Sequence, residues 1–303
     1  MAEAFDLRKV PGDQLVAFYG LNFAAAAADG EIDKDELTTI FESLDLTPLT
    51  EEQKEKVRCY IISPPKIDET LNCIANGSDE LRYTVAVGVI EVILADDVIT
   101  REEDLFLDEI CKRLRVKKDQ REAIINFIKE ARRIRLNGVD DNKAEKALKS
   151  AVSGLTSVGV PIAAVYFSGS VIGLSAAGIT SGLVAIGLGL GMVPGIGIAI
   201  VIGTTIFISM RWLLGDSKKK GEKKLRAENE RKAQLVIKNL QDTINELLVR
   251  ILSIEQKAAE SEANREAIQV LRERLNSLMR ILKQRKQQLA ITSYKDSSLT
   301  TRR

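Results

Sequence analysis

Apolar residues recur at helical spacing through the first half of the chain. Between Leu37 and Leu44 the apolar positions step by three and four residues, and an alanine-rich run from Phe18 to Ala28 precedes them. The sustained period-two alternation that is typical of half-buried strands does not occur in this region. The pattern therefore predicts a compact all-α domain over residues 1–135.

A helix start of one kind occurs twice in this domain. Asp33 is a good N-cap, and Glu36 stands three residues later, where a capping-box partner is expected. Residues 28–36 align with residues 95–103 at an offset of 67 positions, with Thr100 at the cap of the second copy. The alignment predicts a duplicated helix–turn–helix.

The middle of the chain is uncharged. From Ser150 to Met210 there are 61 residues without Asp, Glu, Lys, Arg or His. A membrane-spanning helix needs only about 20 apolar residues, so residues 150–214 are expected to fold back as a hairpin with arms at 158–186 and 197–214. Glycines four positions apart let helices approach closely in lipid. The predicted packing glycines are Gly169, Gly173, Gly178, Gly182, Gly187, Gly191 and Gly195.

Three interpretations of this segment are open. The first is a constitutive transmembrane hairpin. The second is a hairpin that is sheltered in a soluble form and then inserted into a bilayer, as in α-helical pore-forming proteins. The third is the buried core of a permanently soluble protein, which would need much shielding from a chain of this length.

The last part of the chain has a heptad pattern, which predicts a coiled coil over residues 216–291. The apolar seam runs from Ile237 to Ile254, weakens, and resumes from Ile268 to Leu282. We expect one long helix or a nearly continuous pair, with a helical hairpin turning near residues 261–264 as the alternative. Residues 136–149 form a basic linker helix in this scheme, and residues 292–303 are expected to be disordered.

Charge is distributed unevenly along the chain. Residues 1–110 carry 9 Lys and Arg against 25 Asp and Glu, whereas residues 211–303 carry 22 against 12. Basic residues flank the uncharged segment on both sides, which predicts that both termini are cytoplasmic. The cluster after it is expected to contact anionic lipid headgroups. Its members are Lys218, Lys219, Lys220, Lys223 and Lys224.

Other interpretations of this lysine cluster are a solvated helix start and a nucleic-acid contact. Few aromatic residues interleave with the charges of the tail, so base stacking is not expected and we predict no nucleic-acid partner.

The residue types present do not indicate catalysis. The chain has no histidine, and its three cysteines, Cys59, Cys73 and Cys111, show no C-x-x-C spacing. An odd number of cysteines without a disulfide pattern is typical of a reducing compartment. The first twenty residues lack an apolar core, so no cleavable secretory signal is expected. We predict that the protein is not an enzyme.

The two repeated segments also carry a family resemblance. The motifs A-x-A-D-G-x-I-x-x-x-E at residues 26–36 and L-A-D-D-x-I-T-x-x-E at residues 94–103 resemble the TerB (tellurite-resistance) family over about residues 10–135. The resemblance implies an all-helical fold with an acidic face, a role in chemical-stress or phage-resistance systems, and divalent-cation binding without established catalysis. The matching acidic positions are Asp29, Glu31, Asp33, Glu36, Asp96, Asp97, Glu102 and Glu103.

These carboxylates have two possible roles. A hard cation such as Ca²⁺ takes six to eight oxygen ligands, and acidic residues on two adjacent turns can supply several of them. The spacing differs from that of an EF-hand, because Gly30 is at the second loop position rather than the sixth. Alternatively, Asp33 and Thr100 cap helices and the other acidic side chains face solvent.

Together these features predict a membrane-associated, non-enzymatic stress-response or defence protein. It would reside at a bacterial inner membrane, or in the cytoplasm with conditional insertion. The acidic domain would sense a cation or a protein partner, and the basic tail would form homo-oligomers or dock onto that domain by charge. The alternative is a static membrane-anchored scaffold that recruits partners and never permeabilises the membrane.

Overall fold

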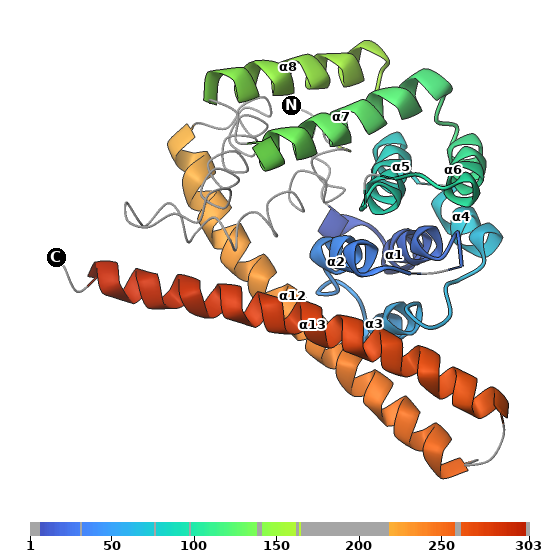
Figure 1. The fold of residues 1–303 in the computed structure, drawn as a ribbon. Helices are drawn as coiled ribbons and strands as arrows, with labels where there is room; N and C mark the ends of the chain where they lie inside the picture. Colours follow the sequence, from blue (N-terminus) through green and yellow to red (C-terminus); the bar gives the residue numbers. More distant parts are fainter. Residues whose placement is uncertain are drawn as a thin grey trace.

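The computed structural model describes residues 7–30, 32–75, 77–96, 98–137, 141–161, 164, 218–257 and 262–300. All regular secondary structure within these ranges is helical, so the all-α prediction is confirmed for them (Figure 1). The first part of the chain contains η1 (Leu7–Lys9), α1 (Gly12–Ala26), α2 (Lys34–Ser43), α3 (Glu51–Cys59), α4 (Ile67–Ala75), α5 (Asp79–Ile93), α6 (Arg101–Arg113), α7 (Lys118–Asn137) and α8 (Asp141–Ser157). Two long helices follow, α12 (Lys218–Lys257) and α13 (Glu262–Thr300).

The helical domain is built from a duplicated unit. Helices α1 and α5 are each 15 residues long and begin at residues 12 and 79, which are 67 positions apart. Helices α2 and α6 begin at residues 34 and 101, and α3 and α7 begin at residues 51 and 118, with the same offset. The predicted duplication is therefore confirmed, and it extends to a third helix.

Side-chain caps fix the starts of these helices. The Oδ1 atom of Asp33 accepts hydrogen bonds from the backbone N–H groups of Asp35 and Glu36, at 2.6 and 2.8 Å, and Glu36 Oε2 accepts from Asp33 N at 2.8 Å. Thr100 and Glu103 form the same reciprocal box at α6, as predicted. Each cap accepts hydrogen bonds from backbone N–H groups that have no partner within the helix. Each contributes about 1 kcal/mol to stability.

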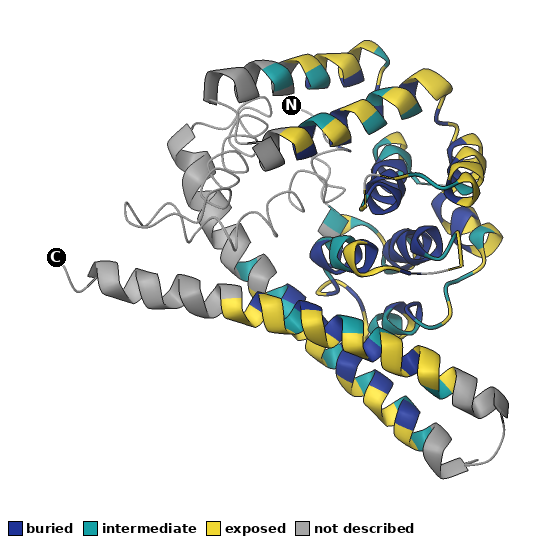
Figure 2. Cartoon of the chain, viewed as in Figure 1, coloured by how far each residue is buried: buried dark blue, intermediate teal, exposed yellow. Residues whose placement is uncertain are grey.

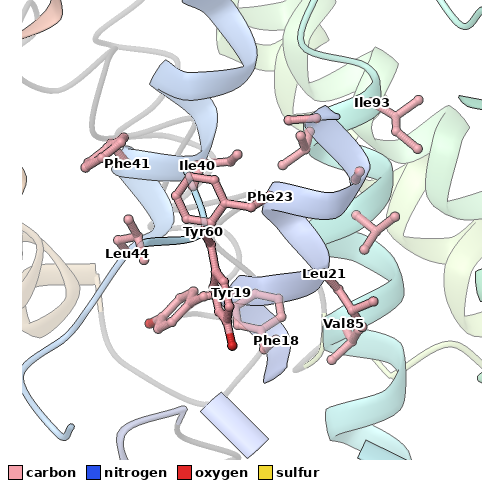
Figure 3. Packing of buried hydrophobic residues seen from close by; sticks show 14 of the residues in the cluster. Phe18, Tyr19, Leu21, Phe23, Ile40, Phe41, Leu44, Tyr60, Val85 and Ile93 are labelled. Carbon is pink, nitrogen blue, oxygen red and sulfur yellow. The ribbon is translucent and has the colours of Figure 1, made fainter. Parts of the chain in front are cut away.

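Helix α1 is the centre of the hydrophobic core (Figure 3). It is apolar around most of its circumference, as expected for a helix covered on all sides. Phe23 packs edge-on against Phe41 of α2, with ring centroids 6.4 Å apart. On the α5 side, a Cβ built on Gly88 would lie 2.7 Å from the ring of Phe18, so this glycine permits the close approach of the two helices.

Helix α8 packs against α7 and includes the first residues of the uncharged segment. Val152 and Leu155 of α8 are buried, so the predicted boundary at residue 150 falls inside a packed helix. Gly159 follows the helix with a φ of +78°, a conformation that glycine adopts without strain. Gln120 Nε2 of α7 donates to the carbonyl oxygen of Val158 at 2.9 Å and holds this turn.

The predicted membrane hairpin lies almost entirely outside the described residues, as do all seven packing glycines. Among the helices that the structure describes, none is both long and apolar enough to cross a bilayer. The transmembrane hairpin therefore stays a prediction from the sequence.

Helices α12 and α13 form an antiparallel hairpin beside the domain, with the turn between residues 257 and 262 (Figure 1). The preferred prediction of one long helix or a nearly continuous pair is therefore wrong. The alternative of a helical hairpin is correct, but α13 already begins at Glu262, within the predicted turn at residues 261–264. Helix α13 extends to Thr300, and the disorder of residues 292–303 stays a prediction. No proline or glycine follows Gly221 in the sequence, so neither residue type accounts for the interruption between α12 and α13.

The predicted seam faces inward along most of the hairpin. Leu240, Ile244, Leu247 and Ile251 of α12 are buried. They meet a buried row on α13 that consists of Leu271, Leu275, Leu278 and Ile281. At the open end of the hairpin one neighbour replaces the predicted residue on each helix: Val236 is buried instead of Ile237, and Ile281 is more buried than Leu282.

The packing of α1 against α5 can be tested with two glycine substitutions. Gly88→Ala would place a methyl group against the Phe18 ring, and we expect it to lower the free energy of unfolding by about 1–3 kcal/mol. Gly154→Ala in α8 meets open space and should raise that free energy by up to about 1 kcal/mol through helix propensity. Urea denaturation measures both. Equal stabilities of the two variants would contradict this packing.

Candidate functional site

The acidic turns of the two repeats bring their capping carboxylates close to each other. Glu36 and Glu103 are both buried, and Glu103 is among the charges that act on Glu36. The pKa of Glu36 is raised to about 8, first by burial and further by the charges of Asp33, Glu103 and Asp29, although the hydrogen bond from the Asp33 backbone opposes the rise. A proton is therefore held on Glu36 through neutral pH.

The other predicted cation ligands are dispersed. Asp29, Asp33, Asp96 and Glu102 are exposed, and Asp96 Oδ1 accepts a hydrogen bond from Val98 N at 3.0 Å. Glu31 and Asp97 lie outside the described residues. The described residues contain no group of three or more His, Cys, Asp or Glu side chains placed to hold a metal ion. The capping role of Asp33 and Thr100 is confirmed, and the cation stays a prediction.

The predicted lipid-contacting lysines are at the N-terminal end of α12. Lys218, Lys219, Lys220, Lys223 and Lys224 all belong to this helix, but their side chains lie outside the described part of the structure. Their contact with lipid is untested.

A group of ion pairs and hydrogen bonds joins the hairpin to the first repeat. At its centre Arg285 of α13 forms an ion pair with Glu42 of α2. The side chains of Arg285 and Glu42 are only 9% and 7% exposed. Burial lowers the pKa of Arg285 to about 10. Burial of these two charges is tolerated only when they form a pair. A single buried charge would have no opposite charge to offset the cost of removing it from water.

A second set of contacts ties α12 to the loop after α2. Arg231 Nη1 lies 2.9 Å from Asp45 Oδ2. Burial disfavours ionisation of Asp45, but hydrogen bonds from Thr47 and the charge of Arg231 outweigh it and hold the pKa of Asp45 below its ordinary value. Tyr19 of the central helix donates to the Asp45 carbonyl at 3.1 Å and accepts from its backbone N–H at 2.9 Å. The loop is thus connected both to the core and to the hairpin.

The hairpin also caps main-chain carbonyl groups of the first repeat. Asn239 Nδ2 of α12 donates to the Leu44 carbonyl at 3.3 Å, and Arg274 of α13 donates to the Ile32 carbonyl. Leu44 and Ile32 stand just after and just before α2. The hairpin therefore recognises both ends of this helix.

Helix α3 forms the remaining edge of the interface. Arg58 lies 3.2 Å from Asp242, and Cys59 Sγ donates to Glu246 Oε1 at 3.3 Å while accepting from Arg250 at 2.7 Å. Burial, followed by the hydrogen bond and charge of Glu246, raises the pKa of Cys59 to about 11. Because the thiolate is the reactive form, Cys59 is a structural thiol here and not a nucleophile.

A difference between the repeats explains why the hairpin covers only the first one. Leu37 and Phe41 of α2 are buried, whereas the equivalent positions of α6 are the exposed acids Asp104 and Asp108. Arg121 of α7 pairs with both of these acids. The apolar face of α2 needs a cover, and the charged face of α6 does not.

The sequence predictions did not include the interface residues. Glu42, Asp45 and Arg285 lie outside the motifs, and each belongs to a charge-rich segment with many similar residues. One signal was present: Phe41 aligns with Asp108 at the same offset of 67. An apolar residue at a position that is acidic in the second repeat indicates a surface with a partner.

Comparisons with protein-family models, with curated proteins and with solved structures found no match for this chain. The TerB resemblance therefore rests on the two motifs alone, and the function that it implies stays a prediction.

The raised pKa of Glu36 predicts a pH dependence of stability. Between about pH 4.5 and 8 the folded chain holds a proton that the unfolded chain releases, so stability should fall as the pH rises through this window. Glu36→Gln keeps a hydrogen-bonding side chain at the capping position and removes the titration. We expect its stability relative to wild type to increase across the window, with a slope of at most about 1.4 kcal/mol per pH unit, the limit for one proton. Chemical denaturation at several pH values measures it.

Glu52→Gln makes the same chemical change on the exposed first turn of α3 and controls for the loss of one charge. If the free energies of unfolding of Glu36→Gln and wild type change with pH in parallel, Glu36 does not retain its proton.

The buried ion pair predicts that substitutions of its two residues have strongly non-additive effects on the free energy of unfolding. Arg285→Met leaves Glu42 buried without its partner, and we expect a loss of about 3–5 kcal/mol in the free energy of unfolding. The double variant Glu42→Met/Arg285→Met removes both charges and should recover most of that loss. Arg133→Met breaks the exposed pair with Glu130 and should cost less than about 1 kcal/mol. A double variant as unstable as Arg285→Met would refute the pairing.

Proposed function

We propose that this chain is a membrane-associated, non-enzymatic protein of a stress or defence response, in which the acidic helical domain holds the basic C-terminal hairpin. The uncharged stretch of 61 residues carries the proposal for the membrane, because such a segment is poorly compatible with water. The apolar part available for insertion begins after Pro161, since α8 and the turn after it are packed in the domain.

The domain–hairpin interface supports a controlled attachment. Its polar contacts include the ion pairs of Arg231 with Asp45 and of Arg58 with Asp242. Interfaces of this polar kind between parts of one chain are commonly dissociable. An anionic lipid surface would compete with the acidic domain for the basic hairpin, and salt would weaken both attractions. The domain would thus restrain the hairpin until the protein reaches a membrane.

A cation belongs to the same proposal. A divalent ion such as Ca²⁺ near the acidic turns would reduce the negative charge of the domain and loosen its hold on the hairpin. The exposed carboxylates of Asp29, Asp33 and Asp96 are the groups that we would expect to meet such an ion first.

A static scaffold is favoured by a different observation. The α6 face of the second repeat carries two exposed apolar side chains, Val98 and Leu105, which are 60% and 61% exposed. Acidic residues of α6, including Asp104 and Asp108, flank them. A basic, partly apolar partner would fit this face. In that case the protein would anchor a partner and leave the membrane intact, and its overexpression would not dissipate the membrane potential.

Liposome flotation and dye release test the proposed function. The purified full chain should float with anionic liposomes. Asp45→Asn removes the partner of Arg231, and weaker docking by about 1 kcal/mol should increase dye release about fivefold. Asp35→Asn, an exposed position on the same domain, provides the same charge change as a control. Absence of flotation at every salt concentration would refute membrane attachment.

A further inference from the structure

Many residues of the two hairpin helices are exposed (Figure 2). Three of the α12 residues that contact the domain, Asp242, Glu246 and Arg250, are four positions apart and therefore lie on one side of the helix. Another side of α12 exposes Leu248, Val249 and Leu252, at 42%, 66% and 55%. Large apolar side chains thus face solvent on a helix whose seam is already filled.

Helix α13 contributes basic residues to this surface. Met279 is 52% exposed, and Arg280, Lys283 and Lys286 are exposed as well. Steps of three and four residues place these side chains on one side of α13, opposite the buried row that includes Leu278 and Ile281. Lys238 of α12 is exposed as well. We call these exposed residues of the two helices together the outer face; its members are Lys238, Leu248, Val249, Leu252, Met279, Arg280, Lys283 and Lys286.

Acidic side chains of the hairpin are kept mostly away from the outer face. Within the described side chains 234–253 and 267–287, the acids are Asp242, Glu246 and Glu273. Asp242 and Glu246 are bound at the domain interface. Glu273 is exposed and accepts a hydrogen bond from Gln269 at 3.1 Å. The docked hairpin therefore directs two of these three acids inward and leaves a net positive, partly apolar surface outward.

We propose that the outer face binds the surface of an anionic lipid bilayer while the hairpin is docked on its domain. Apolar side chains such as Leu252 and Met279 would enter the headgroup region, and Arg280, Lys283 and Lys286 would contact lipid phosphates and carboxylates. Amphipathic helices bind membranes by this combination of apolar burial and attraction to anionic headgroups. The inference rests on the proposed membrane association, but it uses residues other than the uncharged segment and the Lys218–Lys224 cluster.

The chemistry of the outer face favours lipid over nucleic acid. Residues 218–287, which include every member of the outer face, contain no Phe, Trp or Tyr, so no aromatic side chain for base stacking lies in this part of the hairpin. The phosphate backbone of a nucleic acid would contact the basic residues, but it would gain no binding energy from exposed Leu248, Val249 and Leu252. A bilayer uses both kinds of side chain.

An environment-sensitive fluorophore at position 279 tests the contact directly. Cys73 is exposed, whereas burial raises the pKa values of Cys59 and Cys111 to about 11, so a maleimide at neutral pH should label only added or exposed thiols. Full-length Met279→Cys/Cys73→Ser would carry the label on the outer face, and the wild-type chain labelled at Cys73 would carry it on α4. With vesicles of phosphatidylcholine and phosphatidylserine, we expect a blue shift at position 279 and none at Cys73.

Charge removal provides an independent measurement. Arg280→Gln/Lys283→Gln/Lys286→Gln should weaken partition onto these vesicles on the order of 100-fold, the effect expected for three basic residues near a membrane surface. Lys112→Gln/Lys118→Gln/Lys129→Gln removes the same charge from exposed positions of α6 and α7 and should change partition less than about threefold.

The outcomes separate this inference from the proposed function. If the chain floats with vesicles but the label at position 279 stays unchanged and both triple variants partition equally, the outer-face inference is overturned and membrane attachment stands. If no vesicle binds, membrane attachment fails and the outer-face inference fails with it. If a nucleic-acid duplex shifts the label and vesicles do not, the surface belongs to nucleic acid and the lipid assignment is overturned.

Discussion

The structure depends on the burial of α2 from two sides. Helices α1 and α5 cover one side of this ten-residue helix, and α12 and α13 cover the other. A helix of this length is not stable in water alone, so packing determines whether it forms. The second side carries the carboxylate of Glu42, which the hairpin neutralises through Arg285. The docked hairpin thus adds to the stability of the domain.

Electrostatics acts at two ranges in this chain. The opposite net charges of the domain and the tail attract at long range, but this attraction is weak beyond about 10 Å at ordinary salt. The docked position is instead set by short contacts that fit one geometry, among them Arg231 with Asp45 and Asn239 with the carbonyl at the end of α2. The same docking turns Asp242 and Glu246 inward, so the hairpin becomes more basic on its outer side than its composition suggests. The domain–hairpin interface therefore also determines the charge on the outer side of the hairpin.

Much of the domain was predictable because its determinants are close together in the sequence. A cap such as Asp33 acts on backbone groups within three residues, and the offset of 67 is visible in the motifs themselves. The function of each repeat was less predictable, because the two repeats differ on the face where the hairpin packs against the first one. Phe41 and Asp108 occupy equivalent positions, yet one is buried and the other is exposed and pairs with Arg121. The acidic residues of the motifs gave no hint that Glu42 and Asp45 would form the interface.

The sequence by itself determined the helical class, the duplicated unit, the capping residues and the separation of charge along the chain, since each depends on residue type or on neighbours within a few positions. Only the tertiary structure decided that the tail turns back, that it covers the first repeat, and which basic residues meet which acids. Those contacts join residues 186 positions apart in the pair of Asp45 with Arg231 and 242 apart in that of Ile32 with Arg274. At such separations many arginines and carboxylates are equivalent in the sequence, and steric fit in the folded chain selects among them.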